Sequence, residues 1–89
     1  LFGGDDADAL LGGVDADRIF GARGADRLDG GEGADTGSGG AANDTLGGGA
    51  GDDAMFGEDG EDSLSGADGA DSLRGGADND TLLGGLGND

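Results

Sequence analysis

The sequence predicts an all-β repeat fold, a solenoid in which short strands alternate with tight turns. Three observations lead to this prediction. Nine-residue units follow one another along the 89 residues without an insertion or a deletion. Glycine opens each unit and aspartate stands at its sixth position, while the eighth position is a large apolar residue in all units that reach it except one. Self-similarity at a short fixed period is typical of stacked repeats, in which each unit covers the core of its neighbour.

The composition taken alone would indicate a disordered acidic chain. There are 25 glycines and 21 acidic residues against four arginines, and the net charge is −17. Low hydrophobicity combined with a high net charge is the usual signature of disorder. A glycine and an aspartate that keep their register in ten of ten units are not explained by low complexity, so the repeat outweighs the composition.

Several functional classes are excluded by what the sequence lacks. Without cysteine or histidine, neither a disulfide nor a thiolate or imidazole metal ligand can form. Four arginines cannot supply the basic face that nucleic acid or an anionic membrane requires, and no apolar run is long enough to insert into a membrane. Lysine and tyrosine are also absent and no pair of acids stands out from the regular series, so we do not expect an enzyme.

The glycine at the first position of each unit predicts a tight turn that exposes backbone carbonyls. Every unit carries a further glycine at its second or fourth position, and glycine reaches φ > 0 at no steric cost. Aspartate tolerates left-handed backbone conformations and replaces the fourth glycine at Asp6, Asp15 and Asp78, whereas Ala42 is the least suitable replacement there. The first-position glycines, whose carbonyls are candidate metal ligands, are Gly3, Gly12, Gly21, Gly30, Gly39, Gly48, Gly57, Gly66, Gly75 and Gly84.

An aspartate lies five residues after each of these glycines. A solvated acidic face needs no fixed distance from glycine, so the spacing indicates a ligand set of carboxylate and carbonyl oxygens, which hard cations such as Ca²⁺ prefer. The ten aspartates are Asp8, Asp17, Asp26, Asp35, Asp44, Asp53, Asp62, Asp71, Asp80 and Asp89. We expect most of the remaining acids, such as Asp29 and Glu61, to be solvated.

The unit reads G-G-x-G-x-D-x-U-x, in which U is a large apolar residue. From its first residue to its last, the chain resembles the calcium-binding repeat domain of RTX (repeat-in-toxin) proteins. The resemblance implies an all-β fold, a right-handed parallel β-roll (solenoid) of about five 18-residue coils with Ca²⁺ bound in the turns. In that fold six residues of each unit form the turn, and three, such as Ser63-Leu64-Ser65, form a short strand with its apolar residue inside.

An 18-residue coil would divide the aspartates into two columns of five, one on each side of the roll. In the family each ion takes the aspartates of two stacked turns and carbonyls of the glycine-rich segments, so the gaps in the two columns give up to about eight Ca²⁺ ions. Calcium–oxygen distances of about 2.4 Å suit an ion between turns that stack about 4.8 Å apart. These ions would nearly cancel the net charge of −17, and we therefore expect folding to depend on calcium.

The apolar eighth positions divide in the same way. One column, from Leu10 to Leu82, contains leucine throughout, whereas the other has Gly37 at its middle, between Ile19 and Met55. We expect a gap in the core at Gly37, which a leucine there would fill. We also expect calcium, rather than hydrophobic burial, to hold this coil in place.

The ninth position of each unit is expected to face outward. All three phenylalanines of the chain, Phe2, Phe20 and Phe56, occupy it on the same side of the roll. Their rings either form an exposed apolar patch of the kind that marks an interaction surface, or fold over the sheet and cover the thin core. The candidate partners are neighbouring rolls, reached through this face or through the open ends of the stack.

We expect residues 1–89 to form a single repeat array, with nine complete units and a partial unit at each end, cut from a larger protein or assembly. The leading interpretation is a structural module that binds calcium and folds on binding it. The RTX resemblance implies type I secretion of an unfolded bacterial chain and an extracellular or cell-surface location. Two alternatives stay open: a self-assembling surface-layer or filament subunit, and the non-catalytic tail of a secreted hydrolase or epimerase.

Overall fold

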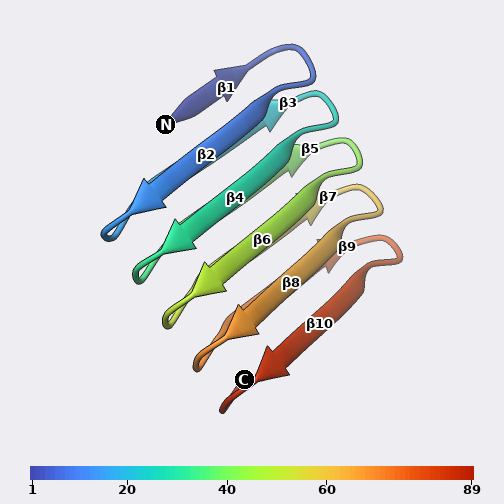
Figure 1. Cartoon of the computed structure of the whole chain (residues 1–89). Helices are drawn as coiled ribbons and strands as arrows, with labels where there is room; N and C mark the ends of the chain where they lie inside the picture. The colour runs from blue at the N-terminus through green and yellow to red at the C-terminus, as the bar shows by residue number, and fades with distance from the viewer.

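The fold consists of two five-stranded parallel sheets that lie face to face, as the computed structural model of residues 1–89 shows (Figure 1). The chain changes sheet after every strand, so sheet A has the order β1-β3-β5-β7-β9 and sheet B the order β10-β8-β6-β4-β2. The strands are β1 (Phe2–Gly4), β2 (Ala9–Val14), β3 (Arg18–Arg23), β4 (Arg27–Glu32), β5 (Thr36–Ala41), β6 (Thr45–Ala50), β7 (Ala54–Asp59), β8 (Ser63–Asp68), β9 (Ser72–Ala77) and β10 (Thr81–Leu86). No helix is present, hence none that is long and apolar enough to cross a membrane.

Two nine-residue units make one coil, and the coils stack in register. Residues 18 positions apart pair throughout, as Leu28 pairs with Leu46 and Ile19 with Gly37. The resulting slab measures 31 × 26 × 12 Å along its principal axes. The predicted all-β solenoid of about five 18-residue coils with parallel strands is confirmed.

The strands are longer than the three residues predicted for them. Every strand except β1 has six residues, beginning directly after an aspartate and continuing through the first three positions of the next unit. Only three residues, such as those from Gly33 to Asp35, are left for each turn after the first, which has four. The ladder extends into the glycine-rich segments because successive coils stack identical backbone, so Gly31 pairs with Gly49 without any side chain to support it.

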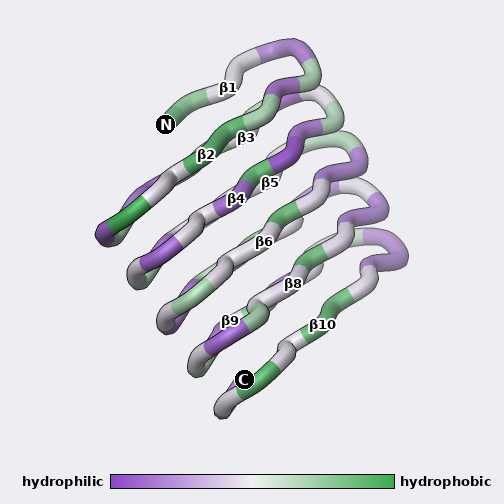
Figure 2. The backbone as a smooth tube through the Cα atoms, in the orientation of Figure 1, coloured by the Kyte–Doolittle hydropathy of each residue, from purple (hydrophilic) through white to green (hydrophobic).

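The core is a single layer of apolar side chains between the sheets. Its fully buried members are Ile19, Leu28, Leu46, Met55 and Leu64. Leu10 and Leu73 pack against them with partial burial, whereas the end members of the two columns, Leu1 and Leu82, are exposed. Figure 2 shows the apolar stretches near the middle of the strands of sheet B, and most of the hydrophilic segments in the turns. The strands thus have little apolar surface with which to hold the two sheets together.

The gap expected at Gly37 is absent, because the neighbouring methionine fills it. Gly37 is buried, and a Cβ atom there would lie 2.6 Å from Sδ of Met55 and 3.5 Å from its Cε. Met55 pairs with Gly37 from the adjacent strand, and a long unbranched thioether adapts to irregular space. The expectation that a leucine at position 37 would fill a void was therefore wrong.

We predict that Gly37→Leu alone destabilises the folded roll by about 1–3 kcal/mol, because the new side chain and that of Met55 compete for one space. Met55→Gly alone empties this space and is also destabilising. The double variant moves a side chain of similar volume to the adjacent strand, so its loss should be at least about 1 kcal/mol smaller than the sum of the two single losses. Denaturant unfolding gives the three values, and additive losses would contradict the shared space.

Candidate metal centre

The ten sixth-position aspartates form two columns, as predicted. In each gap of a column, the backbone N–H of one aspartate donates to Oδ1 of the aspartate 18 residues later, over 2.8 to 3.2 Å. The bonded pairs are Asp8–Asp26, Asp17–Asp35, Asp26–Asp44, Asp35–Asp53, Asp44–Asp62, Asp53–Asp71, Asp62–Asp80 and Asp71–Asp89. These carboxylates therefore tie each coil to the next at both edges of the roll.

Burial distinguishes the column aspartates from the other acids. Those in the middle of the columns are at most 5% exposed, namely Asp26, Asp35, Asp44, Asp53, Asp62 and Asp71. Toward the column ends, Asp8, Asp17 and Asp80 are half-buried and Asp89 is exposed. Asp29 and Glu61, which were expected in solvent, are exposed. The regular spacing in the sequence therefore identified the acids that the fold buries.

The second carboxylate oxygen of most column aspartates lacks a partner. Oδ2 is buried without a hydrogen bond in Asp17, Asp26, Asp35, Asp44, Asp53, Asp62 and Asp71. Buried polar atoms are nearly always hydrogen-bonded, and a buried charge is strongly unfavourable unless it is paired. The same unpaired atom recurs at the same place in successive coils, where a bound cation would satisfy it.

The unpaired oxygens lie against the first-position glycines. A Cβ atom on Gly12 would lie 2.9 Å from Oδ2 of Asp17 and 2.5 Å from the carbonyl oxygen of Gly30 in the next coil. The same arrangement recurs at Gly3, Gly21, Gly30 and Gly57. Glycine at this position therefore leaves room for a carboxylate oxygen of one coil and a carbonyl oxygen of the next. Carboxylate and carbonyl oxygens are the donors that Ca²⁺ takes, so the residues present fit this ion.

The glycine-rich segments, in the turns and at the strand ends beside them, hold several non-glycine residues in the left-handed backbone region. All second-position residues and all but one fourth-position residue have φ between 73° and 137°. The non-glycine residues among them are Asp15, Ala22, Ala42, Glu58, Ala67 and Asp78. Ala42, singled out from the sequence, has φ 92°. Left-handed geometry costs most residues roughly 1–2 kcal/mol each, so these glycine-rich segments are strained.

Burial also changes ionisation in the middle of the columns. Desolvation raises the pKa of Asp44 to about 6, helped by the charges of Asp62 and Asp26 and opposed by the hydrogen bond from the Asp26 backbone. Desolvation likewise raises the pKa of Asp53 and that of Asp62. Without a metal, the centre of each column therefore resists ionisation.

We predict that the calcium-free chain becomes more stable as the pH falls from neutral to about 4. Asp44 has a pKa of about 6 when folded against 3.8 as its ordinary value, so the folded state binds more protons than the unfolded state between these values. The stabilising contribution is fully present below 3.8 and is lost as the pH rises through about 6.

Circular dichroism in excess chelator measures this effect, and we expect more strand signal at acid than at neutral pH. Asp44→Asn should reduce the pH dependence, whereas Asp29→Asn, at an exposed position, should leave it unchanged. A strand signal that falls on acidification would contradict the sign of the shift.

Comparison with known families agrees with this geometry. The family model described as RTX calcium-binding nonapeptide repeat (4 copies) matches residues 2–37, 29–64 and 56–89. No curated protein and no solved structure matches the chain. Because the three family matches together span almost its whole length, the chain belongs to the RTX calcium-binding nonapeptide repeat family, whose repeats bind Ca²⁺.

Proposed function

We propose that this chain is a calcium-dependent structural module, in which ions between stacked turns stabilise the β-roll. The observation that carries the proposal is the buried Oδ2 atom without a partner, present in seven of the ten column aspartates. A divalent cation beside such an oxygen supplies the opposite charge that a buried carboxylate requires. The same ions offset the net charge of −17, which otherwise opposes a compact state.

The proposed ligands are the column aspartates and the carbonyl oxygens of the first-position glycines. Asp17 and Gly30 illustrate the arrangement, since Oδ2 of the first and the carbonyl oxygen of the second approach the same point from successive coils. One ion in each gap between hydrogen-bonded aspartates gives up to about eight ions. No three acidic side chains in the structure are placed to hold one metal ion together, so each ion would take most of its ligands from the backbone.

Sites of this kind would bind calcium weakly, because few ligands carry a charge. We expect dissociation constants of roughly 10⁻⁴ to 10⁻³ M, the range of extracellular calcium modules. Calcium reaches such concentrations outside cells, so we place the folded module there, after export of the unfolded chain. Its role would be structural rather than catalytic, with residues 1–89 as one array in which each coil forms on its neighbour.

Calcium titration of the strand signal tests this proposal. We expect little strand signal in excess chelator and a cooperative rise at roughly 10⁻⁴ to 10⁻³ M calcium. Magnesium is a matched control, because it demands a near-ideal octahedral site with shorter bonds and releases its water reluctantly. A full strand signal in chelator at neutral pH would rule out calcium-dependent folding.

Substitutions within one column sharpen the test. Asp44→Asn removes a charge from two adjacent gaps, so it should raise the calcium midpoint by about tenfold, whereas Asp8→Asn affects one gap and should have a smaller effect. Asp29→Asn, in an exposed residue outside the columns, should leave the midpoint unchanged. Equal midpoints for all three variants would show that the columns are not the binding sites.

A further inference from the structure

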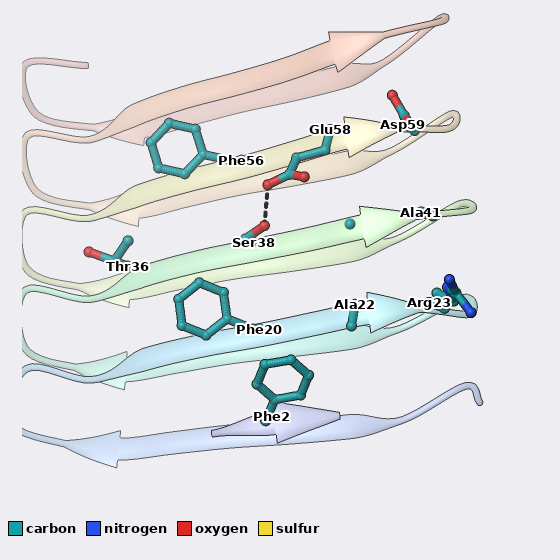
Figure 3. Close-up of a pocket in the computed structure, with 11 residues that line it drawn as sticks. Phe2, Phe20, Ala22, Arg23, Thr36, Ser38, Ala41, Phe56, Glu58 and Asp59 are labelled. Carbon is teal, nitrogen blue, oxygen red and sulfur yellow. Dashed lines mark hydrogen bonds between the residues drawn. The ribbon is translucent and has the colours of Figure 1, made fainter. Parts of the chain in front are cut away.

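The outer face of sheet A carries a row of aromatic rings. The residues that pair across its five strands at the ninth position are Phe2, Phe20, Ser38, Phe56 and Arg74. Phe2 is 72% and Phe20 41% exposed, Phe56 is half-buried, and the ring centroids of Phe2 and Phe20 lie 6.1 Å apart. Figure 3 shows the rings along the surface of the sheet, with Ser38 between Phe20 and Phe56. Of the two sequence-based alternatives, the structure therefore has the surface patch, exposed at Phe2 and Phe20 and half-buried at Phe56.

The charges of the chain are distributed unevenly between its two faces. Three of the four arginines lie on strands of sheet A, together with only two acids, Glu58 and Asp59. The strands of sheet B carry one arginine and three acids. In a chain with a net charge of −17, the outer face of sheet A is thus the broad surface on which acidic repulsion is least.

This face matches a second copy of itself when the copy is rotated about β5. A two-fold axis along β5, between the two copies, keeps the strands parallel and reverses their order, so β3 of one copy faces β7 of the other. Phe20 then faces Phe56 of the partner subunit, and Arg23 faces the partner's Asp59. These residues occupy equivalent positions, because Phe20 and Phe56 both pair with Ser38, and Arg23 and Asp59 both pair with Ala41.

The outermost strands agree with the same rotation. When β1 faces β9 of the second copy, Phe2 lies opposite Arg74 of the partner subunit, and an arginine over an aromatic face is a favourable contact. Each of these contacts occurs twice because of the symmetry. Aromatic rings at the centre of the contact and opposite charges beside them are the usual composition of a specific interface.

A two-fold axis across the strands is less favourable. It would place each strand against its own counterpart in the opposite direction, so that Arg18 at the start of β3 would face the partner's Arg23 at the end of the same strand. Like charges placed opposite one another in an interface are unfavourable. The charges therefore select the axis along β5.

We propose that the calcium-loaded chain forms a two-fold homodimer through the outer face of sheet A, with the axis along β5. A slab face of 31 × 26 Å is similar in size to the roughly 800 Å² that each partner contributes to a standard interface. Two sheets can pack face to face about 10 Å apart with their strands nearly aligned. The proposal rests on the proposed function in one respect, because calcium must first fold the roll.

A charge-swap experiment tests the proposed axis. Arg23→Glu should place two acids opposite each other in both contacts of the symmetric dimer, and Asp59→Arg should do the same with two arginines. Each variant alone should therefore raise the dissociation constant of the dimer by roughly tenfold or more. An equimolar mixture of the two variants should associate again, because each of the two contacts in a mixed dimer then joins one acid to one arginine. If a substitution weakened association only by disturbing its own chain, mixing the two variants would not restore the dimer.

The experiment is sedimentation velocity over a dilution series in saturating calcium, with the strand signal recorded for each variant. Phe56→Ser should raise the dissociation constant by roughly thirtyfold while keeping the calcium midpoint. Asp68→Arg, at the same position of the unit on sheet B, is the matched control and should leave association unchanged.

The outcomes separate the two proposals. A wild-type chain that gains strand signal with calcium but remains monomeric would overturn the dimer alone. A mixture of Arg23→Glu and Asp59→Arg that stays dissociated, although both variants fold, would also overturn it. A chain that gains no strand signal with calcium would overturn the calcium module, and with it the dimer.

Discussion

The whole roll depends on carboxylates that lie one above another in its turns. The backbone N–H of each aspartate donates to Oδ1 of the next aspartate in its column, as Asp26 does to Asp44, so the residue that carries the charge also ties the coils together. Oδ2 of the same residues is mostly buried without a partner. Like charges one strand spacing apart repel strongly where water is excluded, and a divalent cation between them converts this repulsion into attraction. Under the proposed function, the arrangement that opposes stacking would therefore be the one that makes stacking conditional on a cation.

Little else in the molecule would hold the coils together. Only five large apolar side chains are fully buried among 89 residues, and six non-glycine residues take left-handed conformations in the turns or at the strand ends beside them. In most domains the burial of apolar surface is the dominant favourable term. Here burial decides which side of each strand faces inward, whereas under the proposed function the ions in the turns would decide whether the strands form.

The periodicity of the sequence predicted the coil length, the aspartate columns and the outward phenylalanines, because each of these repeats with the unit. Prediction failed where one unit depends on another. Glycine has a low strand propensity, yet Gly31 extends β4 because an identical coil lies beside it. Met55 of the adjacent coil fills the space over Gly37. The sequence of a single unit predicts that this space is empty, because the unit itself has no side chain there. The unpaired Oδ2 atoms depend on side-chain orientation, which no sequence pattern specifies.

The turns and the outer face use different positions of the unit, so they can change independently. The aspartate columns are uniform, whereas the outward positions of sheet A vary from coil to coil. This variation is arranged about β5, since Phe20 and Phe56 lie one strand to either side of it, as do Arg23 and Asp59. Like rings and opposite charges on the two sides of one strand are what a surface needs to match itself after a two-fold rotation. A uniform face would match itself in any register, so the residues of this face that differ from coil to coil select one register. The turns at the edges of the roll keep the uniform repeat that stacking requires.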